Sequence, residues 1–146
     1  MVLYLAEEET LHSKVISHGV QGFSHVTIDV AHLAQSLDFY VRTLGMEVVH
    51  RGRRDVYLTW GTAWVCLQER PELSPLTQQL GVNHVAFYIA PAKFDLLVDV
   101  LRQANVPIVR GPLQRGGGWS INFLDPDGVQ LECYTATLAE RMETWV

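Results

Sequence analysis

The chain has 146 residues, of which 48% are hydrophobic and 18% charged, and it carries a net charge of −5. This length and balance indicate one globular domain that buries about 68–70% of the surface of the unfolded chain. No apolar run reaches the roughly 18 residues of a membrane-spanning helix, and no basic stripe with interleaved aromatic residues indicates nucleic-acid binding. The N-terminal segment is acidic and lacks the apolar core of a secretory signal. We therefore expect a cytoplasmic protein without a nucleic-acid or membrane partner.

Residues 1–21 are predicted to be an N-terminal extension. From Phe23 to Val30 apolar and polar residues alternate, which predicts a strand with one face against a core. A helix is predicted over residues 33–44, because leucine and aromatic residues recur at helical spacing before Gly45. Strands predicted at 46–50, 55–60 and 63–68 complete a βαβββ module over about residues 22–69.

The same order of elements is predicted a second time, after a linker at residues 70–80 that contains two prolines. This second module covers about residues 81–136, with strands at 82–89, 106–110, 119–124 and 129–134, a helix from Pro91 and a flexible loop at 111–118. Thr137 and Glu140 form a capping-box pattern that predicts a C-terminal helix over residues 137–146. We therefore predict one α+β domain over residues 22–146, in which paired βαβββ modules form a curved, half-barrel sheet.

A repeated histidine indicates a metal site. The sequence G-F-S-H-V at residues 22–26 is matched by G-V-N-H-V at residues 81–85, so His25 and His84 hold equivalent places in two like strands. Glu132 lies in the middle of the last predicted strand between apolar neighbours, where a carboxylate is costly to bury unless it is paired or metal-bound. Two imidazoles and one carboxylate leave coordination positions open, which favours a catalytic divalent ion.

Four motifs make the chain resemble the vicinal oxygen chelate superfamily, which includes glyoxalase I, extradiol dioxygenases, bleomycin-binding proteins and fosfomycin-resistance enzymes. They are H-V-T (25–27), L-D-F-Y-V-R-T-L-G-M (37–46), N-H-V-A-F (83–87) and F-L-D-P-D-G-V-Q-L-E (123–132). Within the superfamily the chain is most similar to the fosfomycin-resistance group. Four further stretches carry that similarity: V-H-R-G-R-R-D-V-Y-L (49–58), W-V-C-L (64–67), W-S-I-N-F (119–123) and T-L-A-E-R-M (137–142).

The resemblance implies a metal-dependent enzyme that opens the epoxide of fosfomycin, or of a similar small substrate, by adding a thiol or water. It implies that His25, His84 and Glu132 bind Mn²⁺, or else Mg²⁺, Zn²⁺, Ni²⁺ or Fe²⁺, and that Thr27 contacts the substrate or assists oxirane opening. The substrate-binding residues that it implies are Tyr57, Trp64, Cys66, Ser120, Asn122 and Arg141. It also implies a homodimer in which His25 of one subunit meets His84 and Glu132 of the other. The expected partners are the small-molecule substrate and, for thiol transfer, a low-molecular-weight thiol.

The chain departs from the pattern of the fosfomycin-resistance group in three places. Asn122 replaces the usual tyrosine, residues 111–118 do not match the potassium-binding loop of the glutathione-using branch, and the general-base carboxylate of the water-using branch has no counterpart. The choice between thiol and water therefore stays open. An Fe-dependent extradiol dioxygenase fits the same three ligands. A glyoxalase-like lyase normally takes a fourth ligand from the strand at 63–68, which offers no carboxylate, and a non-catalytic drug-binding protein commonly lacks the three ligands.

The two cysteines, Cys66 and Cys133, have no C-x-x-C spacing. In a cytoplasmic protein we expect both to be free thiols.

Overall fold

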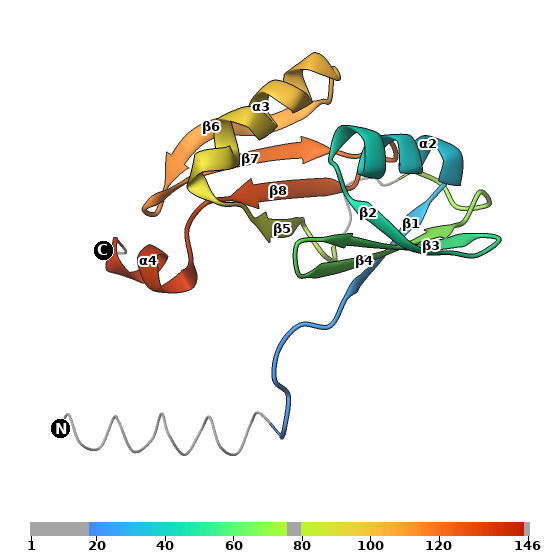
Figure 1. Ribbon diagram of the computed structural model, residues 1–146, viewed down its shortest axis with the longest axis horizontal. Coiled ribbons are helices and arrows are strands. Elements are labelled where there is room, and N and C mark those ends of the chain that lie inside the picture. The colour runs from blue at the N-terminus through green and yellow to red at the C-terminus, as the bar shows by residue number, and fades with distance from the viewer. Residues whose placement is uncertain (1–17, 76–79, 145–146) are drawn as a thin grey trace.

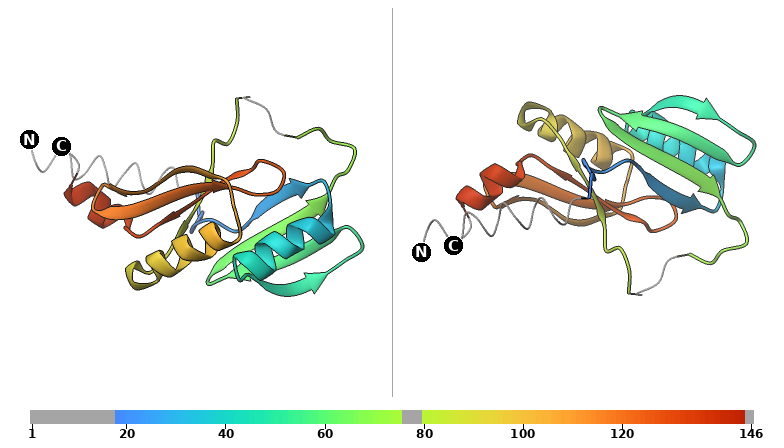
Figure 2. Two further views of the ribbon diagram at one scale, coloured as in Figure 1. Left: turned by 90° about the horizontal axis from the view of Figure 1, so that it is seen from above. Right: turned by 90° about the horizontal axis from the view of Figure 1, so that it is seen from below.

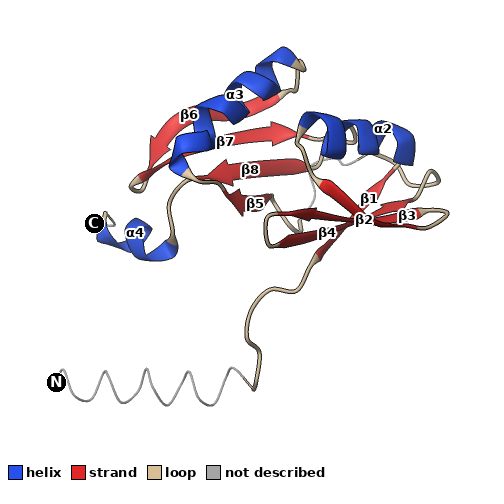
Figure 3. Ribbon diagram, in the orientation of Figure 1, coloured by secondary structure: helices blue, strands red, loops and turns tan. Residues whose placement is uncertain are grey.

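The computed structural model describes residues 18–75 and 80–144, which form two four-stranded sheets with a few helices (Figures 1 and 3). The predicted α+β class of paired βαβββ modules is confirmed. Most of the predicted N-terminal extension, residues 76–79 of the linker and the last two residues of the predicted C-terminal helix lie outside the described residues. In chain order the elements are β1 (Val26–Val30), α2 (Leu33–Leu37), η1 (Asp38–Thr43), β2 (Glu47–Arg51), β3 (Asp55–Trp60), β4 (Ala63–Glu69), β5 (Val85–Tyr88), η2 (Pro91–Lys93), α3 (Phe94–Gln103), β6 (Ile108–Arg115), β7 (Gly118–Leu124), β8 (Gln130–Tyr134) and α4 (Leu138–Glu143).

The two sheets have the same topology. The first has the strand order β1-β4-β3-β2 and the second β5-β8-β7-β6. In each sheet the first strand of the module, β1 or β5, pairs in parallel with the last strand, β4 or β8. The other pairs are antiparallel. The strands β1 and β5, which follow the two repeated histidines, therefore lie at equivalent free edges of the two sheets.

Helices cover one face of each sheet and leave the other face open. Figures 1 and 2 show α2 and α3 on the same side of the molecule, each over its own sheet. Helix α3 packs through Phe94, Leu97, Val98 and Leu101, which recur at helical spacing and are buried. The helix predicted over residues 33–44 is divided into α2 and a wider π-helical turn, η1, and ends before Gly45, whose φ of +83° suits glycine.

The two halves share one hydrophobic core. Phe39 of η1 lies 6.4 Å from Phe123 of β7 between ring centroids, and Trp60 of β3 lies 5.0 Å from Phe87 of β5. A polar contact crosses the same boundary, because the buried Tyr40 hydroxyl donates to Asp125 Oδ2 at 2.8 Å. These contacts fix the two sheets relative to each other.

The prediction of a flexible loop at residues 111–118 is wrong. Strand β6 continues to Arg115 and β7 begins at Gly118, so only a tight turn separates them. The glycines serve close packing instead, since a Cβ at Gly111 would lie 2.5 Å from the carbonyl oxygen of Ser120. The first predicted strands of the two modules also begin later than expected, at Val26 and Val85. Within the part of the chain that the structure describes, no helix combines the length and apolar character needed to cross a membrane.

Candidate active site

The open face of the first sheet carries a row of aromatic rings, one from each strand or its entry. His25, just before β1, stacks on Trp64 of β4 with ring centroids 4.3 Å apart. Trp64 meets Tyr57 of β3 edge-on at 5.5 Å, and Tyr57 lies 5.3 Å from His50 of β2. Trp64 and Tyr57 remain 39% and 36% exposed. Aromatic surface left open beside a histidine is typical of a ligand-binding wall.

Thr27 and Cys66 lie next to this row. Thr27 pairs with Cys66 across β1 and β4, and Cys66 pairs with Tyr57 across β4 and β3, so the three residues adjoin on one face. Burial raises the pKa of the Cys66 thiol, and a hydrogen bond with Thr27 opposes that rise. Cys66 and Cys133 are both free, as predicted, and both are buried; burial raises the pKa of Cys133 to about 12. These thiols are protonated at neutral pH.

The open face of the second sheet carries a carboxylate held by two neighbours. Glu132 of β8 is only 7% exposed, and its Oε1 accepts a 2.6 Å hydrogen bond from Ser120 Oγ of β7. Its other oxygen, Oε2, lies 2.9 Å from Nε2 of His84, just before β5. The structure therefore brings together three of the predicted site residues, His84, Ser120 and Glu132.

Both repeated histidines are oriented by the residue that precedes them. His84 Nδ1 lies 2.7 Å from Asn83 Oδ1, and His25 Nδ1 lies 2.9 Å from Ser24 Oγ. In the tautomer in which Nδ1 of His84 donates to Asn83 Oδ1, which can only accept, Nε2 is left for Glu132 or for a metal ion. An imidazole whose Nδ1 is fixed by a second hydrogen bond is the usual state of a metal-ligating histidine.

This donor set fits a divalent cation. An imidazole nitrogen and a carboxylate oxygen 2.9 Å apart are both acceptors unless a proton or a cation lies between them. An imidazole nitrogen and a carboxylate oxygen are ligands that suit Mn²⁺, Fe²⁺, Zn²⁺ or Ni²⁺.

The three predicted ligands do not meet within one copy of the chain. His25 lies with the first sheet, whereas His84 and Glu132 lie with the second. Among the described residues there is no group of three histidine, cysteine or carboxylate side chains placed to hold a metal.

Asn122 lies beside Glu132 on the second sheet, whereas Arg141 lies at the β6–β7 turn. Asn122 is 1% exposed and pairs with Glu132 across β7 and β8. Its Oδ1 accepts a long hydrogen bond of 3.4 Å from Arg110, while its Nδ2 is buried without a partner among the described residues. The side chain of Arg141, from α4, lies against Gly116 in the β6–β7 turn.

Sequence reasoning missed Ser24, Asn83, Arg110 and His50. A signal for the first two existed, because the residue before each repeated histidine is small and polar. The fourth strand also extends one residue further than predicted, to Glu69. Its carboxylate accepts from the backbone N–H of Leu33 at 2.8 Å, on the helix side, so this strand offers no fourth ligand on the open face.

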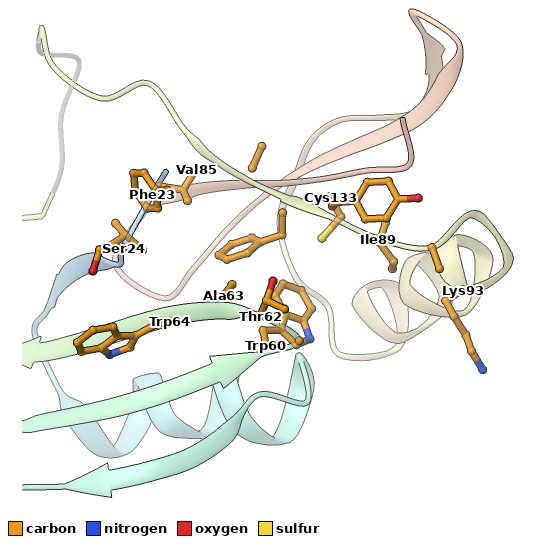
Figure 4. A pocket seen from close by; sticks show the side chains of 16 residues that line it. Phe23, Ser24, Trp60, Thr62, Ala63, Trp64, Val85, Ile89, Lys93 and Cys133 are labelled. Atoms are coloured by element: carbon orange, nitrogen blue, oxygen red, sulfur yellow. The ribbon is translucent and has the colours of Figure 1, made fainter. Parts of the chain in front are cut away.

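A cavity of about 560 Å³ opens between the free edges of the two sheets (Figure 4). Trp60 and Trp64 line it from the first sheet, and Phe87, Ile89 and Cys133 from the second. Among the described residues that line it, none is a predicted metal ligand. This mainly apolar surface therefore shares Trp64 with the aromatic row of the first sheet and, over the described residues, contains none of the predicted metal ligands.

Comparison with known proteins decides the family. The model of the Glyoxalase/Bleomycin resistance protein/Dioxygenase superfamily matches residues 22–133. The chain belongs to this superfamily. The resemblance inferred from the motifs is thereby confirmed.

Several superfamily members similar to this chain are named for fosfomycin resistance or thiol transfer. Glutathione transferase FosA of Serratia marcescens is 36% identical over 84% of this chain and 86% of that protein. Metallothiol transferase FosB of Shouchella clausii is 31% identical, again over 84% and 86%. The crystal structure of the fosfomycin resistance protein FosX from Listeria monocytogenes, complexed with Mn(II) and a sulfate ion, is 26% identical with a TM-score of 0.71. The match covers 85% of this chain and 97% of that one.

Proposed function

We propose that the chain is a metal-dependent enzyme that opens the epoxide of fosfomycin, or of a similar small phosphonate, by adding a thiol or water. The observation that carries the proposal is the His84–Glu132 pair, whose members are oriented by Asn83 and Ser120. The similar proteins named FosA, FosB and FosX support the reaction, and the Mn(II) in FosX supports Mn²⁺ as the ion. We place the enzyme in the cytoplasm, where low-molecular-weight thiols and its own cysteines stay reduced.

The complete site requires two copies of the chain. We propose a homodimer in which His25 of one copy joins His84 and Glu132 of the other, so that each dimer has two equivalent sites. The free edges of β1 and β5 support this arrangement, as do Phe23 and Val82, which precede those strands and are each 85% exposed. Residues 22–146 would then act as one unit that contributes half of two sites.

Roles in the reaction follow from the placement of the side chains. The divalent ion, when bound, supplies a Lewis acid for the oxirane oxygen. The thiol or water forms a bond to a ring carbon, the carbon–oxygen bond breaks, and the oxygen ends as a hydroxyl with the proton that the nucleophile loses. We assign Thr27 to a hydrogen bond with that oxygen, and Tyr57, Trp64 and Cys66 to the wall that packs on the hydrocarbon part of the substrate.

The phosphonate needs donors on the second sheet. We assign the guanidinium of Arg141 and the unpartnered Nδ2 of Asn122 to this anion, since hydrogen bonds from a cation to a phosphonate are strong. Ser120 contributes as well, but its only proton is donated to Glu132. Its first role in this proposal is therefore to orient the carboxylate.

A direct assay tests the reaction. Purified protein with Mn²⁺ is incubated with fosfomycin and glutathione, cysteine or no thiol, and the product is identified by mass spectrometry. A thiol adduct or a diol supports the proposal and shows which nucleophile is used. If no product forms with any acceptor, and the gene fails to protect a sensitive host, the fosfomycin proposal is rejected. Oxygen uptake with catechols and Fe²⁺ would favour the dioxygenase alternative instead.

Mixed dimers test the shared site. His25→Ala and His84→Ala are each expected to be inactive, because each removes one imidazole from both sites. When the two variants are unfolded together and refolded, half of the dimers should be mixed and should carry one intact site. About a quarter of wild-type activity is therefore expected. A mixture that stays inactive, although mass spectrometry shows mixed dimers, would contradict the shared site.

A further inference from the structure

The turn between β6 and β7 is formed by three consecutive glycines, Gly116, Gly117 and Gly118. Each faces the C-terminal segment that follows β8. Figures 1 and 2 show α4 at the end of the second sheet where β6 and β7 meet. An added Cβ at Gly118 would lie 2.8 Å from both Ala136 Cβ and Thr135 Oγ1, and one at Gly117 would lie 3.4 Å from the carbonyl oxygen of Glu140. The absence of side chains thus lets the segment pack directly on the backbone.

Gly116 contacts a functional candidate. A Cβ at this position would overlap Nη1, Cδ and Cζ of Arg141, so the arginine side chain occupies the space that a larger residue would fill. The φ of Gly116 is +56°, in the left-handed region that favours glycine. The chain conformation and the placement of Arg141 therefore both favour glycine here.

The turn beneath Arg141 is fastened to the same strand that carries Glu132. The Tyr134 hydroxyl lies 2.7 Å from the carbonyl oxygen of Arg115 and 2.9 Å from that of Gly116, so its single proton is shared between the two acceptors. Tyr134 and Glu132 are two residues apart on one face of β8, which places them about 7 Å from each other along the strand. The strand that carries the carboxylate thus also holds the turn on which Arg141 lies.

We propose that Gly116 is a positioning residue. It lets the side chain of Arg141 lie across the β6–β7 turn, and so sets the guanidinium at the end of the open face of the second sheet before any anion binds. The consequence for phosphonate binding rests on the function proposed above for Arg141. A guanidinium whose position is fixed before the anion arrives loses less conformational freedom on binding than the end of a mobile arginine side chain does.

The chain offers a matched control for the test. Gly61, in the β3–β4 turn, has a φ of +57° and nothing within 4 Å of an added Cβ. Gly116→Ala and Gly61→Ala therefore carry the same backbone strain, and only the first also displaces Arg141. Because the overlapped atoms belong to the flexible end of an arginine, Gly116→Ala should move that side chain without preventing folding.

Two measurements decide the proposal. In metal-free protein, the NMR signal of the Arg141 Nε–Hε group, identified by its loss in Arg141→Lys, should shift in Gly116→Ala and stay in place in Gly61→Ala. In Mn²⁺-loaded protein, calorimetry with methylphosphonate should show affinity about ten- to a hundredfold lower for Gly116→Ala than for Gly61→Ala, the range expected for a lost hydrogen bond to a charged group. In an Arg141→Ala background, Gly116→Ala should cause no further loss.

The proposal is overturned if the Arg141 signal is the same in Gly116→Ala as in wild type. It is also overturned if Gly116→Ala weakens methylphosphonate binding equally with and without Arg141. If the wild-type protein binds no methylphosphonate, the anion role of Arg141 is rejected, and the NMR comparison alone decides whether Gly116 positions it. Should Gly116→Ala not fold, Tyr134→Phe loosens the same turn by removing the hydroxyl proton that the two turn carbonyls share, and must shift the Arg141 signal if the proposal is correct.

Discussion

The contact between Tyr40 and Asp125 should stabilise the joint between the two halves by a measurable amount. Tyr40 is fully buried and Asp125 is 3% exposed, and the hydroxyl donates to Oδ2 at 2.8 Å. The other carboxylate oxygen accepts from the backbone N–H groups of Asp127 and Val129. In Tyr40→Phe, Oδ2 loses its partner and stays buried, which should lower the free energy of unfolding by about 1.5–3 kcal/mol at pH 7.

The cost of Tyr40→Phe should depend on pH. Burial raises the pKa of the Asp125 carboxyl above its ordinary value, and the hydrogen bond from Tyr40 opposes that rise. The folded state therefore binds the Asp125 proton more tightly than the unfolded state, so this group adds stability as the pH falls through its folded pKa. Without the Tyr40 hydroxyl the pKa should rise further. The penalty of the substitution should then shrink as the pH falls from neutral through the raised pKa of the folded state, because the neutral acid costs less to bury.

Urea unfolding at fixed protein concentration, followed by circular dichroism, measures both effects. Tyr88→Phe is the matched control, since Tyr88 is 61% exposed and its loss of a hydroxyl should change stability by less than about 0.5 kcal/mol. Asp125→Asn should remove the pH dependence of the penalty. The reasoning is refuted if Tyr40→Phe costs no more than Tyr88→Phe at pH 7, or if its cost stays constant as the pH is lowered from neutral until the folded protein is acid-denatured.

Three further results are expected. Ser120→Ala should weaken Mn²⁺ binding by about ten- to a hundredfold, because Glu132 loses the hydrogen bond that orients it, and calorimetry showing less than a twofold change would contradict this. Cys66 should react slowly with iodoacetamide at pH 7 and faster as the pH rises, because its raised pKa keeps the thiol protonated; fast labelling at pH 7 would disprove this. Leu101→Ala should lower the free energy of unfolding by about 2–5 kcal/mol, whereas Leu96→Ala, at a 59% exposed position of the same helix, should change it by less than about 0.5 kcal/mol in the same urea titration.

Local sequence signals predicted most of the secondary structure because each depended on residues close together in the chain. Alternation predicted that Ile28 and Val30 face the core, and they are 5% and 1% exposed. The Thr137 cap is confirmed, since its side chain accepts from the backbone N–H of Glu140. The repeat of His25 at His84 predicted equivalent positions in two sheets, which is what the topology shows.

The β6–β7 turn and the Asn83 contact show where such signals stop. A run of glycines has the same sequence whether it is flexible or packed against another segment, and here the deciding partner, Arg141, lies well outside the run. Likewise, the carboxylate of Glu132 could be placed on the open face by alternation, but its hydrogen bond with Ser120 depends on the pairing of β7 with β8.

The predicted metal ligands are divided between the two sheets, so the contact between the sheets affects where those ligands lie. His25 is carried by the first sheet and the His84–Glu132 pair by the second, and the core that contains Tyr40 holds the sheets rigidly relative to each other. In the dimer proposed above, the position of each sheet in one copy sets the geometry of a site completed by the other copy. A shift at this joint would therefore move ligands in both sites at once, so Tyr40→Phe should weaken Mn²⁺ binding although it touches no predicted ligand.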